Sequence, residues 1–198
     1  MNIHPETHRF LSRLEKETLL QQRGLAIWMS GLSGSGKSTI ANATERILHS
    51  HGRFTIILDG DNLRTGLNSN LSFSDPDRLE NIRRIAELAK ILVQNGIIVF
   101  ISAITPTTQL RTLARTIIGP ENLLEVFVKA SYTACEQRDV KGLYAKAARG
   151  ELENFTGKDS SFEPPTSPDL TLDTESLSIQ AAALTLLTAI HSKTQPIS

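Results

Sequence analysis

The residues with the clearest chemical potential lie in a glycine-rich run, Gly31-Leu-Ser-Gly-Ser-Gly-Lys-Ser38, which matches the spacing G-x-x-x-x-G-K-S in full. Its glycines let the backbone wrap closely around phosphate oxygens, and successive backbone N–H groups direct positive dipoles at them. Lys37 adds a mobile positive charge, and the Ser38 hydroxyl is suited to bind Mg²⁺. The run therefore predicts a site for the phosphates of ATP. The residues predicted to form this site are Gly31, Leu32, Ser33, Gly34, Ser35, Gly36, Lys37, Ser38 and Thr39.

A glycine-rich turn can also serve only to pack a helix against a strand. Such a turn would require neither Lys37 nor Ser38 at its place, so we favour phosphate binding. Nucleotide binding alone does not separate a kinase from a GTPase-like switch or a motor. The rest of the chain has to distinguish these classes.

Two carboxylates and an arginine follow the second apolar segment. The run from Leu58 to Arg64 places Asp59 and Asp61 two residues apart, where the chain would leave a sheet. Ligands bind at the carboxyl ends of strands in open α/β sheets. One carboxylate can hold a metal-bound water or accept the proton of an acceptor hydroxyl, and Arg64 can bind a substrate anion. The alternative is an Asp-Gly turn with solvated charges.

The third apolar segment ends in the run 102–106, Ser-Ala-Ile-Thr-Pro, which carries no acidic residue. The metal-side carboxylate is therefore expected among the two aspartates of the preceding run. Farther on, Arg78 and Asn81 are spaced to share one helical face. A solvated helix face is the alternative for each arginine of this stretch taken alone. These arginines are Arg78, Arg83 and Arg84.

Apolar segments of strand length alternate with segments of helical pattern. Strands are expected at 25–29, 55–58, 97–101, 124–128 and 170–172. Helices are expected at 7–22, at 38–51, from an N-cap at Asp75 with Pro76 at the first helical position to about residue 96, and at 178–190. The alternation predicts a three-layer α/β fold, a parallel sheet with helices on both faces.

The length of 198 residues predicts one sizeable core and one domain. We expect residues 1–22 to form an N-terminal helical extension and residues 23–198 to form that domain. Residues 150–168 are rich in Gly, Pro, Ser and Asp without apolar periodicity, so they predict a long functional loop.

Composition restricts the partners. The 21 basic residues balance the 21 acidic ones, so no overall field favours nucleic acid or an anionic membrane. No apolar run approaches the roughly 20 residues that span a bilayer, and the N-terminus lacks the apolar core of a signal peptide. The single Cys135 cannot form an internal disulfide, which favours a reducing compartment. We therefore expect a cytoplasmic protein.

Several separated motifs, in order, make the chain resemble the adenylyl-sulfate kinase family, also called adenosine 5′-phosphosulfate (APS) kinases. The resemblance runs from about Arg23 to Thr174. Its motifs are Gly-Leu-Ser-Gly-Ser-Gly-Lys-Ser-Thr (31–39), Leu-Asp-Gly-Asp-Asn-Leu-Arg (58–64), Asp-Arg-Leu-Glu-Asn-Ile-Arg-Arg-Ile-Ala-Glu (77–87), Cys-Glu-Gln-Arg-Asp-Val-Lys-Gly-Leu-Tyr-Ala-Lys-Ala (135–147) and Asn-Phe-Thr-Gly-Lys-Asp (154–159).

The resemblance implies a fold like that of P-loop nucleoside triphosphate hydrolases. It also implies transfer of the ATP γ-phosphate to the ribose 3′-hydroxyl of adenylyl sulfate, giving 3′-phosphoadenylyl sulfate. Mg²⁺ would be required, and most of the family forms homodimers. Lys37 and Asp61 are the implied catalytic residues, with Asp61 beside the acceptor hydroxyl, and Ser38 and Asp59 are implied at the metal.

The resemblance also assigns substrate contacts and a lid. The implied substrate-binding residues are Asp61, Arg64, Phe73, Arg78, Asn81, Ile104, Thr105, Lys141, Leu143 and Phe155. Phe73 and Phe155 match two aromatics that sandwich the substrate adenine, a role suited to flat polarisable faces, and we expect both to be exposed in the free enzyme. Residues from about 136 to 165 would form the lid. Its implied basic residues are Arg138, which also contacts ATP, Lys141 and Lys146.

The chain departs from the family pattern at residues 104–108. The family usually has Ile-Ser-Pro followed by an aromatic and a basic residue, whereas this chain has Ile-Thr-Pro-Thr-Thr. The serine has been described as a phosphorylated intermediate, but direct in-line transfer needs no such group. We treat Thr105 as a substrate-loop residue and a candidate phosphoacceptor. The departures bear on substrate affinity more than on reaction type, and Arg111 matches the family's arginine in this region.

Two other functions remain open. A kinase of the same fold with another small acceptor would account for the altered residues 105–108. A catalytically silent nucleotide-binding module, which would bind ATP without turnover, is the alternative from a different class. The presence of Lys37, Ser38, Asp61 and Arg64 argues against the silent module.

Overall fold

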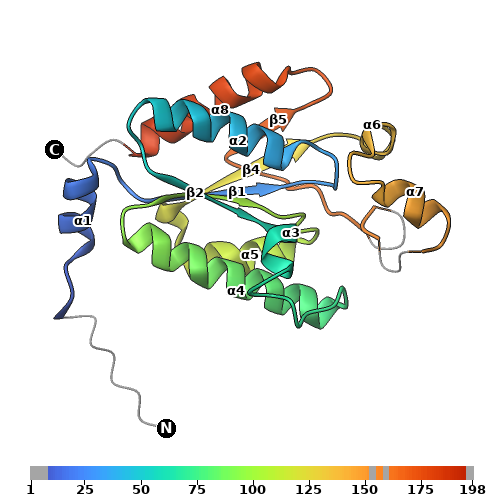
Figure 1. The fold of residues 1–198 in the computed structure, drawn as a ribbon, viewed down its shortest axis with the longest axis horizontal. Coiled ribbons are helices and arrows are strands. Elements are labelled where there is room, and N and C mark those ends of the chain that lie inside the picture. Colours follow the sequence, from blue (N-terminus) through green and yellow to red (C-terminus); the bar gives the residue numbers. More distant parts are fainter. Residues whose placement is uncertain (1–8, 152–154, 158–160, 195–198) are drawn as a thin grey trace, which may run out of the picture.

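A computed structural model describes residues 9–151, 155–157 and 161–194 of the chain. Its centre is a five-stranded parallel sheet in the order β2-β3-β1-β4-β5 (Figure 1). The strands are β1 Leu25–Ser30, β2 Thr55–Asp59, β3 Ile98–Ser102, β4 Leu123–Lys129 and β5 Leu170–Asp173. Every expected strand overlaps an observed one, and the expected parallel sheet is confirmed.

Four long helices cover the two faces of the sheet. They are α2 Lys37–Ser50 and α8 Ile179–Thr194 on one face, and α4 Asp75–Gln94 and α5 Thr108–Ile118 on the other (Figure 1). Every residue of β1 and β3 is buried, as their continuous apolar sequences predict for strands covered on both sides. The three-layer arrangement leaves the carboxyl ends of the strands free for a site.

Shorter helices complete the chain. They are α1 Arg13–Leu20, α3 Gly60–Arg64, α6 Tyr132–Arg138, α7 Leu143–Ala148 and the 3₁₀ turn Pro120–Asn122. Our sequence analysis did not predict α3, because five residues are too few for an apolar period to emerge. Asp59 caps this helix, since its side chain accepts the backbone N–H groups of Asp61 and Asn62.

The helix expected at 7–22 is shorter in the structure. It begins after the N-cap Ser12, which forms a capping box with the third helical residue. Residues 1–8 lie outside the described part of the chain. Leu14 and Leu19 are 57% and 83% exposed, so the expected apolar face of this helix is not buried against the domain.

The predicted start of α4 was wrong by one residue. The N-cap is Ser74, whose hydroxyl accepts the backbone N–H of Asp77, while Asp75 and Pro76 are the first two helical residues. Aspartate and proline both suit the first turn of a helix, so the two residues correctly indicated a helix start, which lies one residue earlier than predicted.

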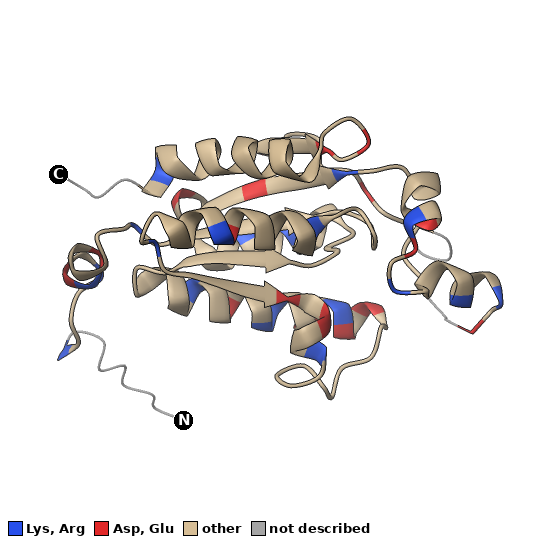
Figure 2. Cartoon of the chain, turned by 45° about the horizontal axis from the view of Figure 1, so that its top comes forward, with Lys and Arg blue, Asp and Glu red and all other residues tan. Residues whose placement is uncertain are grey.

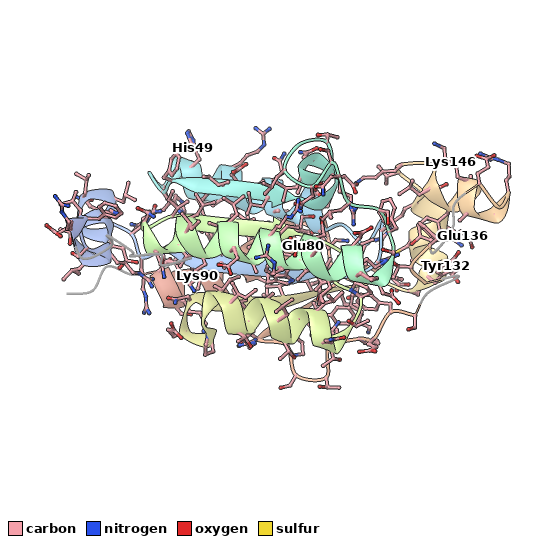
Figure 3. The ribbon with its side chains drawn as sticks, turned by 90° about the horizontal axis from the view of Figure 1, so that it is seen from below. His49, Glu80, Lys90, Tyr132, Glu136 and Lys146 are labelled. Carbon is pink, nitrogen blue, oxygen red and sulfur yellow. The ribbon has the colours of Figure 1, made fainter. Side chains whose placement is uncertain are left out.

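Helices α6 and α7 stand beyond the carboxyl end of the sheet, at the opposite end of the molecule from α1 (Figure 1). Tyr132, Glu136 and Lys146 belong to this region (Figure 3). A separate small apolar cluster holds it together. That cluster contains Leu32, Cys135, Tyr144, Ala147 and Phe155.

Charged residues of both signs are spread over the two helical layers (Figure 2). Acidic and basic residues also meet around the end of β2 and α3 (Figure 2). Among the described residues, no helix combines the length and the apolar character needed to cross a membrane.

Candidate active site

A cavity of about 380 Å³ lies at the carboxyl ends of β1, β2 and β3. Its walls come from the phosphate loop, defined as Gly31–Ser38, from α3 and from the first turns of α4. Two further walls are residues 102–106, here called the acceptor loop, and residues 139–144 of the α6–α7 region. The cavity thus joins most of the segments to which the sequence assigned chemistry.

The phosphate loop depends on glycine at one crowded position and at one position of positive φ. A Cβ atom at Gly31 would lie 2.4 Å from the carbonyl oxygen of Val128, and Gly36 has a φ of +103°. Lys37 is buried, and its Nζ donates to the carbonyl oxygens of Gly31 and Leu32 at 2.9 and 2.8 Å. Burial lowers the pKa of Lys37 to about 8. The lysine is therefore a desolvated cation held by weak partners that phosphate oxygens can replace.

Three oxygen-bearing side chains meet beside this lysine. The Ser38 hydroxyl donates to Asp59 Oδ2 at 2.6 Å and lies 2.9 Å from the Ser102 hydroxyl. Burial alone would raise the pKa of Asp59, but hydrogen bonds from Ser38 and two backbone N–H groups lower it below its ordinary value. The carboxyl is thus held ionised, and hard oxygen donors of this kind suit Mg²⁺.

Asp61 projects from α3 and forms an ion pair with Lys141. Their side chains are 65% and 50% exposed, so this pair contributes little to stability. The contact matters because it brings the α6–α7 region to the carboxylate expected beside the acceptor hydroxyl.

Arg64 and Arg78 converge on the same wall of the cavity as Asn81. Burial and the neighbouring Arg78 charge lower the pKa of Arg64, although an arginine stays protonated at neutral pH. The Arg64 guanidinium lies 4.2 Å from the centre of the Phe73 ring, and Phe73 is 56% exposed, as expected. Two half-buried cations side by side are suited to a doubly charged anion.

The expected exposure of Phe155 is wrong. The residue lines the cavity but is only 9% exposed, because its ring packs edge-on against Tyr144 with 4.9 Å between centroids. Tyr144 in turn donates from its hydroxyl to the carbonyl oxygen of Ser33 at 2.8 Å. The polar sequence around Phe155 suggested a solvated side chain, but the α6–α7 cluster covers it.

The acceptor loop is held from three sides. Thr105 has a φ of +48°, its hydroxyl accepts the Trp28 indole N–H at 3.0 Å, and its backbone oxygen accepts from Arg111 at 3.2 Å. The Gly31 N–H donates to the carbonyl oxygen of Ile104 at 3.2 Å. Thr105 is 1% exposed, so its hydroxyl is engaged in the protein interior.

The model of the adenylylsulphate kinase family matches residues 23–173. The chain belongs to the adenylylsulphate kinase family. An adenylyl-sulfate kinase from Bacteroides fragilis is 55% identical over 186 residues, which cover 94% of this chain and 92% of that protein. The Mycobacterium tuberculosis APS kinase in complex with AMPPNP and APS has a TM-score of 0.83 and 44% identity, covering 85% of this chain and 98% of that chain. A hexameric APS kinase from Thiobacillus denitrificans has a TM-score of 0.66 and 28% identity, covering 87% of this chain and 30% of that chain. The expected family and fold are confirmed.

Most residues assigned from the phosphate-loop motif or from the family resemblance line the cavity. They are Ser33, Gly34, Gly36, Lys37, Ser38, Asp59, Asp61, Arg64, Phe73, Arg78, Asn81, Ile104, Thr105, Lys141, Leu143 and Phe155. Five assigned residues do not line it: Gly31, Leu32, Ser35, Thr39 and Arg138. Arg138 lies against the outside of the phosphate loop, donating to the Gly34 carbonyl oxygen at 3.3 Å and to the Thr174 carbonyl oxygen at 2.8 Å. Lys146, a lid residue by family resemblance, also lies outside the cavity walls.

Several wall residues were missed by sequence reasoning. They are Gly60, Ile82, Ser102, Ala103, Pro106, Leu110, Asp139, Val140, Tyr144 and Thr156. The sequence showed Ser102 only as a hydroxyl after the third expected strand, whereas its register with Asp59 at the end of β2 comes from the structure. Tyr144 and Thr156 fall inside two of the family motifs but were given no role; the structure places Tyr144 against the Ser33 carbonyl oxygen, and the Thr156 hydroxyl accepts from Arg78. Asn154, Lys158 and Asp159 of the last family motif lie outside the described residues.

Proposed function

We propose that the chain is an ATP-dependent kinase that transfers the γ-phosphate of ATP to the 3′-hydroxyl of adenosine 5′-phosphosulfate, in sulfate assimilation. The observation that carries this proposal is one cavity that joins Lys37 of the phosphate loop to Asp61 and to the pair Arg64 and Arg78. A nucleoside triphosphate and an anionic acceptor can therefore meet in one open cavity. The family membership of the chain supports the same reaction.

The donor half of the site is the phosphate loop. On ATP binding, Lys37 exchanges the two backbone carbonyls for phosphate oxygens and neutralises charge on the transferred group. The oxygen cluster of Ser38, Asp59 and Ser102 fits Mg²⁺, which would shield the phosphates. We place Ser38 and Asp59 at the metal, with Ser102 orienting the serine.

The acceptor half is built around Asp61. Its carboxylate takes the proton of the 3′-hydroxyl as the new O–P bond forms and the bond from the γ-phosphorus to ADP breaks. Arg64, Arg78 and Asn81 bind the phosphosulfate, and Phe73 and Phe155 flank the adenine. Lys141 leaves Asp61 for the transferred phosphate when the lid, about residues 136–165, closes.

The remaining proposals concern the whole molecule. We propose a single kinase domain at 23–198 preceded by the extension 1–22, a cytoplasmic location and a homodimer. Because an APS kinase of known structure is hexameric, the assembly needs its own measurement. Light scattering on the purified chain distinguishes twice the mass of 21.8 kDa from other multiples.

The reaction itself is tested by incubating purified protein with ATP, Mg²⁺ and adenosine 5′-phosphosulfate. Chromatography should show equal amounts of ADP and 3′-phosphoadenylyl sulfate, and chelation of Mg²⁺ should stop both. ATP binding without product would favour the silent module. ADP release with other nucleosides or sugars, but not with adenosine 5′-phosphosulfate, would favour a kinase for another acceptor.

Replacing Thr105 by valine should leave phosphate transfer largely intact. Valine keeps the shape of threonine but removes the hydroxyl, which the structure buries against Trp28 rather than offering to phosphate. The indole N–H loses its partner, so stability should fall by about 1–3 kcal/mol. Thermal unfolding and kcat measure the two effects, with Thr105→Ser as the variant that retains the hydroxyl. The opposite result has two parts: the valine variant loses turnover while the serine variant keeps it, and Thr105 of the wild-type chain is found phosphorylated. That result would establish Thr105 as a phosphoacceptor.

Replacing Phe155 by alanine should raise KM for adenosine 5′-phosphosulfate by about tenfold, since stacking on an aromatic ring contributes about 1–3 kcal/mol per base. KM for ATP should change much less. Phe155→Leu is the matched control, because leucine retains apolar packing against Tyr144 but lacks the flat face. An equal rise in both variants indicates stacking. A rise confined to alanine indicates packing alone, and an unchanged KM in both removes Phe155 from the adenine site.

A further inference from the structure

One face of α4 holds the segment 65–74, which leads from α3 to α4. Arg84 donates to the carbonyl oxygen of Leu67 and to Asn70 Oδ1 at 3.1 and 2.8 Å, and Arg78 donates to the carbonyl oxygen of Phe73 at 2.9 Å. The side chains of the segment are exposed or partly exposed, with one exception. The exception is Asn68, which is completely buried.

Asn68 is fixed through its backbone and its side chain. Its N–H donates to the carbonyl oxygen of Leu63 at 2.8 Å, and its carbonyl oxygen accepts the N–H of Leu71 at 3.1 Å. Its Nδ2 donates to Asn81 Oδ1 at 2.9 Å. Through Asn68, the short connection between α3 and α4 therefore makes a direct contact with Asn81, a wall residue of the cavity.

This contact decides whether Asn81 presents its carboxamide oxygen or its NH₂ group to the cavity. A carboxamide has one acceptor oxygen and one NH₂ donor group. The hydrogen bond turns the oxygen of Asn81 toward Asn68 and leaves the Nδ2 group, on the other branch of the carboxamide, for a ligand. The neighbours in that wall are Arg64 and Arg78, and a donor beside two cations suits an anion, whereas a carbonyl oxygen would repel one.

A polar side chain at position 68 carries a free-energy penalty, so filling space cannot be the reason for an asparagine there. Its Oδ1 is buried and accepts no hydrogen bond from any residue that the structure describes. A buried oxygen without a partner is unfavourable, and an apolar side chain would fill the space without that penalty. The donor group of Asn68 is therefore the feature that distinguishes it from leucine at this position.

We infer that Asn68 is a positioning residue for the acceptor substrate: it holds the Asn81 carboxamide with its Nδ2 group toward the phosphosulfate anion. The inference rests on the proposed function, because it assumes that this anion binds at Arg64, Arg78 and Asn81. Asn68 does not line the cavity, so it acts through Asn81.

The test is steady-state kinetics of Asn68→Ala and Asn68→Leu beside the wild-type chain. KM for adenosine 5′-phosphosulfate should rise about tenfold or more, because a hydrogen bond to a charged group is misdirected. KM for ATP and kcat should change little, since the phosphosulfate is bound alike in ground and transition states. Asn68→Leu retains side-chain volume and tests the hydrogen bond even when Asn68→Ala fails to fold, which thermal unfolding reveals.

Asn70→Ala is the matched control, because Asn70 is an exposed asparagine of the same segment that contacts Arg84 rather than Asn81. In the Asn81→Ala background, Asn68→Ala should add no further increase in KM. An equal rise in the Asn70 variant, or additive effects of Asn68 and Asn81, would overturn the inference. If the wild-type chain forms product and the Asn68 variants have its KM for adenosine 5′-phosphosulfate, only the inference is overturned. If the wild-type chain forms no product, the proposed function is overturned as well.

Discussion

Replacing Lys37 by alanine should abolish measurable turnover, a fall of about a thousandfold or more in kcat. The ammonium is buried beside the phosphate loop and donates to the carbonyl oxygens of Gly31 and Leu32. Its pKa of about 8 reflects the cost of that burial. Phosphate oxygens carry negative charge, which the neutral carbonyl oxygens lack, and so would stabilise the ammonium better. Without the lysine, charge on the transferred phosphate loses its strongest protein partner.

The control for this experiment is Lys90→Ala, since Lys90 lies along α4 away from the cavity (Figure 3). Thermal unfolding of both variants separates loss of fold from loss of chemistry. Folding should survive the change at Lys37, because the substitution removes a desolvated cation whose charged form burial disfavours. Near-normal rates in a folded Lys37→Ala variant would refute the role of the phosphate loop in transfer.

Replacing Asp61 by asparagine should lower kcat by about a hundred- to ten-thousandfold, the usual contribution of a general base. Asparagine is nearly the same size but accepts no proton at neutral pH. KM for ATP should be nearly unchanged, because Asp61 belongs to α3 and not to the phosphate loop. The melting temperature should also change little, since the broken ion pair with Lys141 is exposed.

Asp75→Asn serves as the matched control, because Asp75 is an exposed carboxylate in the first turn of α4 that does not line the cavity. Its kcat should stay close to that of the wild-type chain. A folded Asp61→Asn variant with wild-type kcat would exclude Asp61 as the proton acceptor. The proton would then have to pass to water or to a phosphate oxygen.

The local chemistry of the donor half was readable in the sequence because it is carried by contiguous residues. The phosphate loop requires glycine at crowded positions and a lysine at a fixed spacing, so a single run of eight residues contains the whole pattern. The strands were predictable for a similar reason, since strands buried on both faces must be continuously apolar.

Errors arose where burial depends on distant segments. Phe155 sits in a polar stretch and was expected to be exposed, but Tyr144 and the cluster around Cys135 bury it. The helix at 7–22 had an amphipathic pattern, yet Leu14 and Leu19 remain exposed. Periodicity indicates which side chains could be buried but does not supply their partners.

By itself the sequence determined the phosphate loop, the parallel α/β fold and the family, because local spacing and continuous apolar runs encode all three. Tertiary structure alone decided that Ser102 joins Ser38 and Asp59, that the Thr105 hydroxyl turns inward to Trp28, and that Asn68 reaches Asn81. Each of these contacts joins residues between 13 and 77 positions apart. Their geometry is set by strand register and helix packing, which no short window of sequence contains.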